Sequence, residues 1–210
     1  VGLVQLRQTD DRWAFAAPPL QRKDISAEEL APYLTALGLH ASDIQAAQHL
    51  NNGPHFLGLL INDIDQLLSM EPDHHALKRL GFMVGVAARK PESTSTTTPP
   101  LIRRANREAR AFAASSNHSL DDANAADPFD LEVRAFTSAL DVVEDPVTGS
   151  LNASLAQWLM SEKLMPQKYI ARQGTVMGRA GMVYLSQDET GQVWVGGDVV
   201  DCIQGQVRIG

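Results

Sequence analysis

The sequence predicts an α+β fold in which a sheet wraps around one strongly apolar helix. Short β-like apolar runs dominate the chain from residue 129 onward, and a single helical stripe of apolar residues over 151–159 interrupts them. Two earlier apolar runs, 56–61 and 82–88, have the length of buried strands. Strands, one apolar helix and further strands in this order are typical of an α+β domain.

Composition limits the classes of protein that the chain can belong to. It has 210 residues, 44% of them hydrophobic and 20% charged, and a net charge of −7. The acidic balance disfavours a broad nucleic-acid or anionic-lipid surface, and no apolar run approaches the ~20 residues of a membrane span. A single cysteine, Cys202, allows no internal disulfide and no thiolate metal cluster. We expect a soluble cytoplasmic protein that binds neither nucleic acid nor membrane.

The chain opens with a strand-like alternation over 3–7 and a second apolar run at 13–15, separated by a polar turn. Two strands alone are only marginally stable in water, so we expect the partners of this hairpin to lie elsewhere, upstream of residue 1. We predict that residues 1–20 are junction strands from a first half that is missing or truncated in this sequence. A processed chain is the alternative.

A polar linker is expected at 21–24, followed by a helix. Ser26 and Glu29 have the spacing of a capping box, and leucines recur at helical intervals until Gly38. Pro32 fits poorly inside a helix, which leaves open a start near that residue.

The next stretch alternates turns, strands and short helices. Asn51 to Pro54 form a strong turn signal before the strand at 56–61. Asn62 is expected to cap one helix, and Pro72 to open another that ends at Gly81. The strand at 82–88 follows.

Residues 90–127 are predicted to be a mobile loop, because they include a low-complexity Ser/Thr/Pro run and carry no clear apolar period. Four arginines between 103 and 110 suggest a phosphate or nucleic-acid contact. Four aspartates between 121 and 130 follow closely, so a solvated surface is the preferred interpretation.

After residue 129 the pattern becomes dense. A strand at 131–136 is followed by the helical stripe, which Pro166 ends. Strands and turns then run to residue 209, including a hairpin around 188–191 and a last strand at 206–209.

The segment 144–150 holds the residues best suited to chemistry. Pro146 keeps Asp145 extended, so its carboxylate projects from the end of a strand. Gly149 lets the backbone approach a ligand closely, and Ser150 lies in the first helical turn, where unpaired N–H groups attract an anion. Such a site suits a small carboxylate with an ammonium or hydroxyl group held by Asp145.

An ordinary N-cap explains the same residue types equally well, since Asp, Thr and Ser commonly precede apolar helices. The complete string is more informative than its residue types. Glu144-Asp145-Pro146-Val147-Thr148-Gly149-Ser150, with the helix start after it, resembles the signature of the PhzF-like (phenazine biosynthesis PhzC/PhzF) family of isomerases. Further pieces resemble the family in the expected order: Asn52-Gly53-Pro54, Arg134-Ala135-Phe136, Gln173-Gly174, 177–181 and 193–197.

The resemblance implies a fold like that of diaminopimelate epimerase, a mixed sheet or barrel around a central helix, with 21–210 as the second PhzF-like half. It also implies a homodimer and a cofactor-independent, metal-free isomerase that moves a proton on a small carboxylate metabolite. Asp145 would be catalytic, Thr148, Gly149 and Ser150 would bind substrate, and Asn52 and Gly53 would line the cleft.

In the family, a glutamate from the first half acts as general acid/base, and it has no counterpart in this sequence. This partial chain would therefore be a poor catalyst by itself. A non-catalytic protein that binds small anions, or a partner, through the helix-end pocket is the alternative.

Overall fold

The computed structural model describes residues 3–9, 12–91, 129–200 and 202–208. Contacts divide the chain into two units, one formed by Val1–Lys90 with Phe129–Gly210 and the other by Pro91–Pro128. Nearly all of the predicted loop 90–127, with its arginines, thus lies outside the described residues. The first unit contains every element discussed below.

The described strands are β1 (Leu6–Thr9), β2 (Arg12–Ala16), β3 (Gln21–Asp24), β4 (Ile44–Asn51), β5 (His55–Ile61), β6 (Met83–Arg89), β7 (Leu131–Phe136), β8 (Lys168–Gln173), β9 (Gly181–Gln187) and β10 (Val193–Asp198). The described α-helices are α1 (Ala27–Leu37), α2 (Ile64–Ser69), α3 (His74–Leu80) and α5 (Gly149–Ser161).

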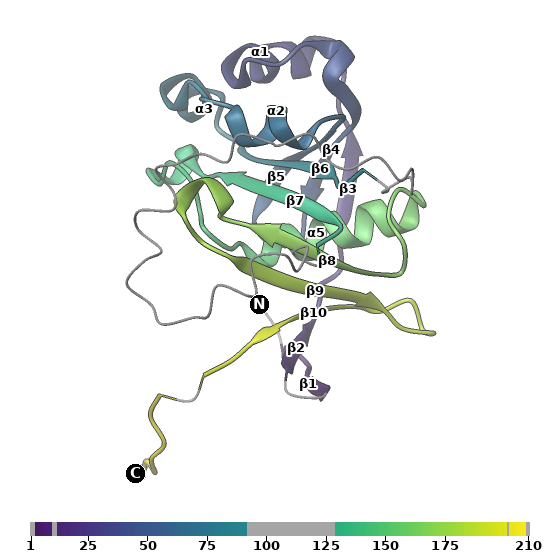
Figure 1. The fold of residues 1–210 in the computed structure, drawn as a ribbon, viewed down its shortest axis with the longest axis vertical. Coiled ribbons are helices and arrows are strands. Elements are labelled where there is room, and N and C mark those ends of the chain that lie inside the picture. The colour runs from purple at the N-terminus through teal and green to yellow at the C-terminus, as the bar shows by residue number, and fades with distance from the viewer. Residues whose placement is uncertain (1–2, 10–11, 92–128, 201, 209–210) are drawn as a thin grey trace, which may run out of the picture. The chain divides into compact units, whose positions relative to one another are not determined.

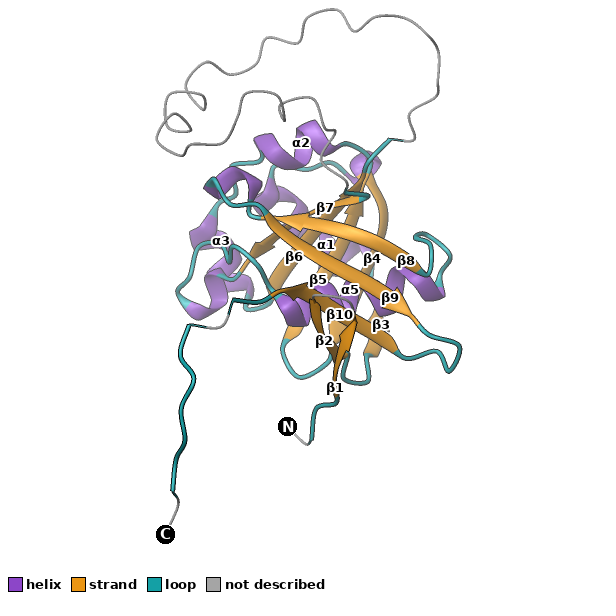
Figure 2. Ribbon diagram, turned by 60° about the horizontal axis from the view of Figure 1, so that its bottom comes forward, coloured by secondary structure: helices purple, strands orange, loops and turns teal. Residues whose placement is uncertain are grey.

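All described strands join one sheet in the order β1-β2-β10-β9-β8-β7-β6-β5-β4-β3. The pairs β5–β6 and β7–β8 are parallel and the others antiparallel, so the sheet is mixed. It curves around α5, and helices α1, α2 and α3 lie on the opposite side of the strands (Figures 1 and 2). The α+β prediction of a mixed sheet around a central helix is therefore confirmed, with an open sheet that ends at β1 and β3.

Alternating strand residues supply two cores, one on each face of the sheet. Phe56 and Leu60 of β5 pack in the cluster that contains α5, whereas Leu57 and Leu59 pack in the cluster under α1, α2 and α3. Nine residues of α5 are buried, which explains why its sequence is apolar on more than one side. The helix lies so close to β6 that a Cβ added at Gly85 would be 2.3 Å from a Leu151 methyl carbon.

Several local predictions are confirmed. The expected strands at 56–61, 82–88 and 131–136 correspond to β5, β6 and β7, and the apolar stripe forms α5. Ser26 caps α1 by accepting a hydrogen bond from the Glu29 N–H at 3.1 Å. Helix α1 therefore begins before Pro32, which lies inside it.

Other local predictions are wrong. The expected linker at 21–24 is the edge strand β3, paired with β4. Asp63, and not Asn62, caps α2, and α3 begins after its cap Asp73 instead of at Pro72. Residues 202–208 are exposed and form no strand, so the strand expected at 206–209 is absent from the part of it that is described.

The opening hairpin finds its partner within this chain. Strands β1 and β2 pair with each other, and β2 pairs on its other side with β10, Ala16 opposite Trp194 and Arg12 opposite Asp198. The expectation of an upstream partner is therefore wrong for β2, because both of its neighbouring strands, β1 and β10, belong to this chain. Among the described helices, none has the length and apolar character needed to cross a bilayer.

Candidate functional site

The loop before α5 begins as an extension of the sheet. The Asp145 N–H donates to the carbonyl of Ala135 at 3.0 Å, in an isolated antiparallel bridge to β7. Asp145 is thus extended, as expected for a residue that precedes proline. The carboxylate of Asp145 therefore leaves the end of a strand and lies next to the first turn of α5.

A buried ion pair fixes the residue before Asp145. Glu144 accepts hydrogen bonds from Arg134 Nε at 3.0 Å and Nη2 at 2.8 Å, and the two side chains are only 9% and 5% exposed. The remaining nitrogen of Arg134 donates to the carbonyls of Leu67 and Met70 near the end of α2. Buried charges need such complete pairing, and here it ties the loop to β7 and α2.

Gln173, at the end of β8, holds the loop through four side-chain hydrogen bonds. Its Oε1 accepts from the Thr148 N–H at 3.0 Å and from Asn152 Nδ2 at 2.8 Å. Its Nε2 donates to the Asp145 carbonyl at 2.8 Å and to the Thr148 hydroxyl at 3.0 Å. Sequence reasoning noted Gln173 only as part of a closing strand, because its partners are distant in the chain.

Thr148 holds the N-cap position of α5 without capping it. Its hydroxyl donates to Asp145 Oδ2 at 2.7 Å, and the Thr148 side chain makes no capping hydrogen bond to the N–H groups of the first turn. The N–H groups that open α5 therefore lack the side-chain partner that an N-cap usually supplies. The interpretation of this segment as an ordinary N-cap is not what the hydrogen bonds show.

The turn between β4 and β5 meets the same helix end. Asn52 Nδ2 donates to the carbonyl of Ser150 at 2.9 Å, which brings together two segments that the sequence placed near one cleft. Asn52 Oδ1 is buried and has no partner within the described residues. Gly53 has a positive φ of 124° that favours glycine, and it is exposed at the tip of the turn.

His55, at the start of β5, belongs to a packed cluster. Its Nε2 lies 3.2 Å from His49 Nδ1, and its ring packs on Phe82. Burial, and then the neighbouring His49, lower the pKa of His55 below its ordinary value. These are the contacts of a histidine that packs at the start of a strand.

A pocket of about 520 Å³ lies beside the start of α5. Of the six candidate site residues, Gly149 alone lines this pocket, whose other walls are mostly apolar side chains and strand backbone. A Cβ added at Gly149 would lie 3.5 Å from two ring carbons of Phe15, another wall residue. Main wall residues are Trp13, Phe15, Val147, Met182 and Val195.

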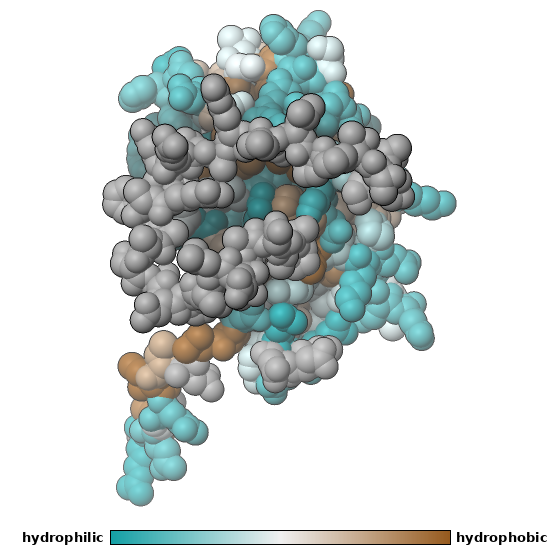
Figure 3. All heavy atoms as spheres, in the orientation of Figure 1, coloured by the Kyte–Doolittle hydropathy of each residue, from teal (hydrophilic) through white to brown (hydrophobic). Residues whose placement is uncertain are grey.

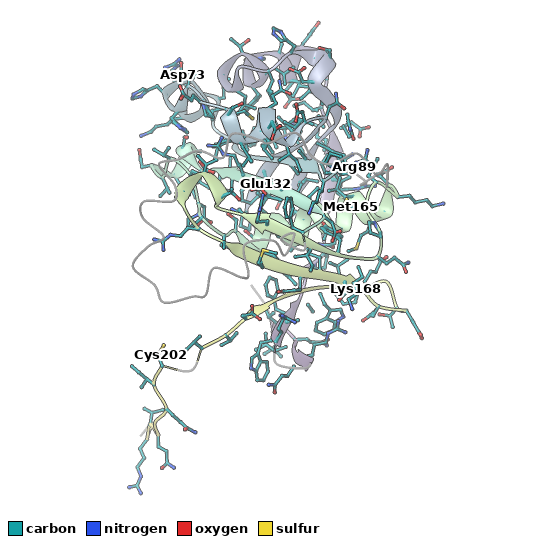
Figure 4. The ribbon with its side chains drawn as sticks, in the orientation of Figure 1. Asp73, Arg89, Glu132, Met165, Lys168 and Cys202 are labelled. Atoms are coloured by element: carbon teal, nitrogen blue, oxygen red, sulfur yellow. The ribbon has the colours of Figure 1, made fainter. Side chains whose placement is uncertain are left out.

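Glu132 and Cys202 lie outside this loop. Glu132 lies in the middle of the sheet, fully buried, where it accepts from Arg172 Nε at 2.6 Å and from the Thr175 hydroxyl at 2.5 Å (Figure 4). Cys202 lies on the exposed stretch after β10, away from the loop (Figure 4). That stretch also presents hydrophobic side chains at the surface (Figure 3). Within the described ranges, no three His, Cys, Asp or Glu side chains gather to hold a metal ion.

An open mixed sheet around one helix, with a polar loop at the start of that helix, defines an α+β protein of the diaminopimelate-epimerase-like class. The chain belongs to the PhzC-PhzF family of phenazine biosynthesis-like proteins, whose model matches residues 5–205. It is similar to the uncharacterized isomerase YddE of Escherichia coli, with 36% identity over 55 residues, 24% of this chain and 18% of that protein.

Solved structures share the fold. A PhzF-family phenazine biosynthesis protein from Bacillus anthracis matches 92% of this chain with a TM-score of 0.63 and 15% identity. A predicted epimerase from Pseudomonas aeruginosa matches 93% with a TM-score of 0.58 and 17% identity. The chain spans 60% and 58% of the lengths of these two proteins.

Proposed function

We propose that this chain supplies the substrate-anchoring half of an isomerase site that moves a proton on a small carboxylate metabolite without a cofactor. Membership in the PhzC-PhzF family supports an isomerase, as do the names of the E. coli and P. aeruginosa proteins that it resembles. The observation that carries the proposal is the uncapped start of α5, with the Asp145 carboxylate next to it.

The chemistry follows from the groups at this helix end. Amides of the first turn and the positive end of the helix dipole attract a carboxylate. Asp145 Oδ2 accepts from Thr148, and no other described side chain donates to Oδ1, which can therefore accept from an ammonium or hydroxyl group of the substrate. When a proton leaves a carbon conjugated with the substrate carboxylate, the amides stabilise the negative charge that develops. The proton returns to another carbon of the same molecule, so the reaction is an isomerisation.

The carboxylate of Asp145 anchors the substrate during the transfer, and the acid/base group that moves the proton, which typically contributes ~10²–10⁴ in rate, comes from outside this loop. Glu144 next to it is paired with Arg134 and is not free for this role. The one carboxylate oxygen of this loop without a partner in the described part of the chain is Asp145 Oδ1, which suffices for binding but not for moving a proton. A non-catalytic small-anion binding protein is therefore the second candidate function.

The test separates binding from turnover. We would titrate the ¹⁵N-labelled chain with anthranilate and benzoate, and then incubate it with a dihydro-hydroxyanthranilate in D₂O. Shifts of the Gly149 and Ser150 amides together with deuterium at a substrate carbon support the isomerase. Amide shifts without deuterium support the binding protein, and unchanged amides would exclude this helix end as a site.

Two variants sharpen the test. Asp145→Ala should weaken anthranilate binding about 10–100-fold, since a hydrogen bond to a charged group is worth ~1.5–3 kcal/mol. Asp141→Asn is the matched control, because the Asp141 side chain is 76% exposed and is paired with Lys78. Equal affinities in the two variants would remove Asp145 from the binding site.

A further inference from the structure

We infer that Gln173 is the positioning residue of this site: its buried amide sets the direction of the hydrogen bond between Thr148 and Asp145, so that Asp145 offers Oδ1 to the ligand as an acceptor. The inference rests on the proposed function of Asp145. It adds a role for two residues, Gln173 and Thr148, that do not themselves need to touch the substrate.

The orientation of the Gln173 amide follows from its neighbours. The atom 3.0 Å from the Thr148 backbone nitrogen must be an oxygen, because a backbone N–H can only donate. The same oxygen accepts from Asn152 Nδ2 at 2.8 Å. A flipped amide would set its NH₂ group against the Thr148 N–H, so the flipped form is disfavoured. Both hydrogens of Nε2 therefore point to the other side, toward the Asp145–Thr148 segment.

Those two hydrogens determine where the Thr148 proton goes. One is donated to the Asp145 carbonyl at 2.8 Å and the other to the Thr148 hydroxyl oxygen at 3.0 Å. A hydroxyl has a single hydrogen, and the described acceptor for it is Asp145 Oδ2 at 2.7 Å. Oδ2 is thereby an acceptor, and Oδ1 is left for a donor on the ligand.

Burial makes this arrangement costly to change. Gln173 is fully buried and makes four hydrogen bonds through its side chain, so any rotation would leave unpaired polar atoms. The strand end carrying it can approach the loop because residue 174 is glycine. A Cβ there would lie 2.7 Å from the Pro146 carbonyl oxygen, and the backbone φ is +89°.

Three variants of the full chain test the role, each with anthranilate and benzoate, which differ by the amino group that Asp145 would hold. We expect the wild type to prefer anthranilate about 10-fold, within the range of one charge-assisted hydrogen bond. Thr148→Ser keeps the hydroxyl and should keep this preference within about twofold. Thr148→Val removes the hydroxyl and should abolish the preference, with benzoate affinity within about twofold of wild type because the helix amides are untouched.

Gln173→Glu adds a pH signature. It keeps an oxygen toward Thr148 N–H and Asn152, but its second oxygen attracts the Thr148 hydroxyl proton away from Asp145 when ionised. Burial raises the pKa of such a carboxyl, so lowering the pH protonates it and restores a donor. In a titration from pH 8 downward, the preference for anthranilate should therefore be absent while the new carboxyl is ionised and return once it is protonated, in this variant alone.

Different failures have different meanings. If Thr148→Val and Gln173→Glu weaken both ligands equally at every pH, or leave the preference intact, Gln173 only stabilises the fold and the inference is overturned. If the wild type binds neither ligand, the proposed function fails and the positioning role fails with it. Exchange of the Gln173 side-chain amide protons as fast as those of exposed Gln204 would overturn the hydrogen-bond geometry itself.

Discussion

Gly149→Ala is expected to raise stability and lower ligand affinity at once. Gly149 is the first residue of α5, its φ is not positive, and an added Cβ would meet only the Phe15 ring, at 3.5 Å. This is ordinary van der Waals contact, so alanine fits without strain. Replacing glycine at a compatible site stabilises by about 0.4–1 kcal/mol through the unfolded chain. For a chain of this size that is a rise in melting temperature of roughly 1–4 °C.

The same methyl group would occupy the pocket at the uncapped amides. Its contact Phe15 lines the pocket with Gly149, so the methyl lies where the ligand carboxylate is proposed to sit. We expect anthranilate affinity to fall about 10-fold or more, equivalent to ~1.4 kcal/mol. Calorimetric unfolding and ligand titration measure the two effects separately. A stabilised variant with unchanged affinity would refute the location of the site.

A second glycine provides the control for this prediction. Gly178 has a φ of +68° and open space around its Cα hydrogen, so alanine there is strained without touching the pocket. The left-handed conformation costs a non-glycine residue about 1–2 kcal/mol. Gly178→Ala should therefore lower the melting temperature and leave affinity unchanged, the reverse of Gly149→Ala.

Two further predictions concern stability. Arg134→Met should lower the free energy of unfolding in urea by about 3–5 kcal/mol, because it leaves the Glu144 carboxylate buried and unpaired. The double variant Arg134→Met with Glu144→Leu should recover much of this loss. A loss below ~1 kcal/mol in the single variant would contradict the burial of this pair. Hydrogen bonds from the Thr190 side chain and then from Trp194 Nε1 lower the pKa of Asp188 from 3.8 to about 2. A lowered folded-state pKa stabilises the fold above pH 3.8, and this contribution is lost as the pH falls through about 2. The difference in melting temperature between wild type and Asp188→Asn should thus shrink from pH 4 to pH 2, and a constant difference would refute it.

Local patterns predicted much of the fold, and long-range pairing accounts for the rest. The strands β5, β6 and β7 and helix α5 follow from apolar period and length alone. Strand β3 was missed because it lies at the sheet edge with all four residues exposed, so it shows no alternation of apolar and polar residues. The pairing of β2 with β10 joins residues near opposite ends of the chain, which no local pattern can reveal.

The residues of the candidate site also differ in how far local sequence indicates them. Asp145, Thr148, Gly149 and Ser150 are consecutive enough to be found as one string. The sequence did not indicate Gln173 as a candidate site residue. Its proposed role depends on hydrogen bonds to Thr148, which lies 25 residues earlier in the chain. In such cases the available sequence signal is a polar residue at the end of a strand and before a glycine. This signal does not indicate which residues the polar side chain binds.

The hydrogen bond made by the Thr148 hydroxyl is the strongest support for a binding role of this helix end. A threonine at the N-cap position normally accepts from the first turn and is worth about 1 kcal/mol to the helix. Here the hydroxyl is directed to Asp145 instead, and Gln173 holds it there. The fold thus forgoes a capping bond, leaves amides of α5 without a side-chain partner beside a pocket, and fixes one carboxylate oxygen. A helix that needed only a stable start would gain from the opposite arrangement, and this is why we propose that an anionic ligand completes the cap.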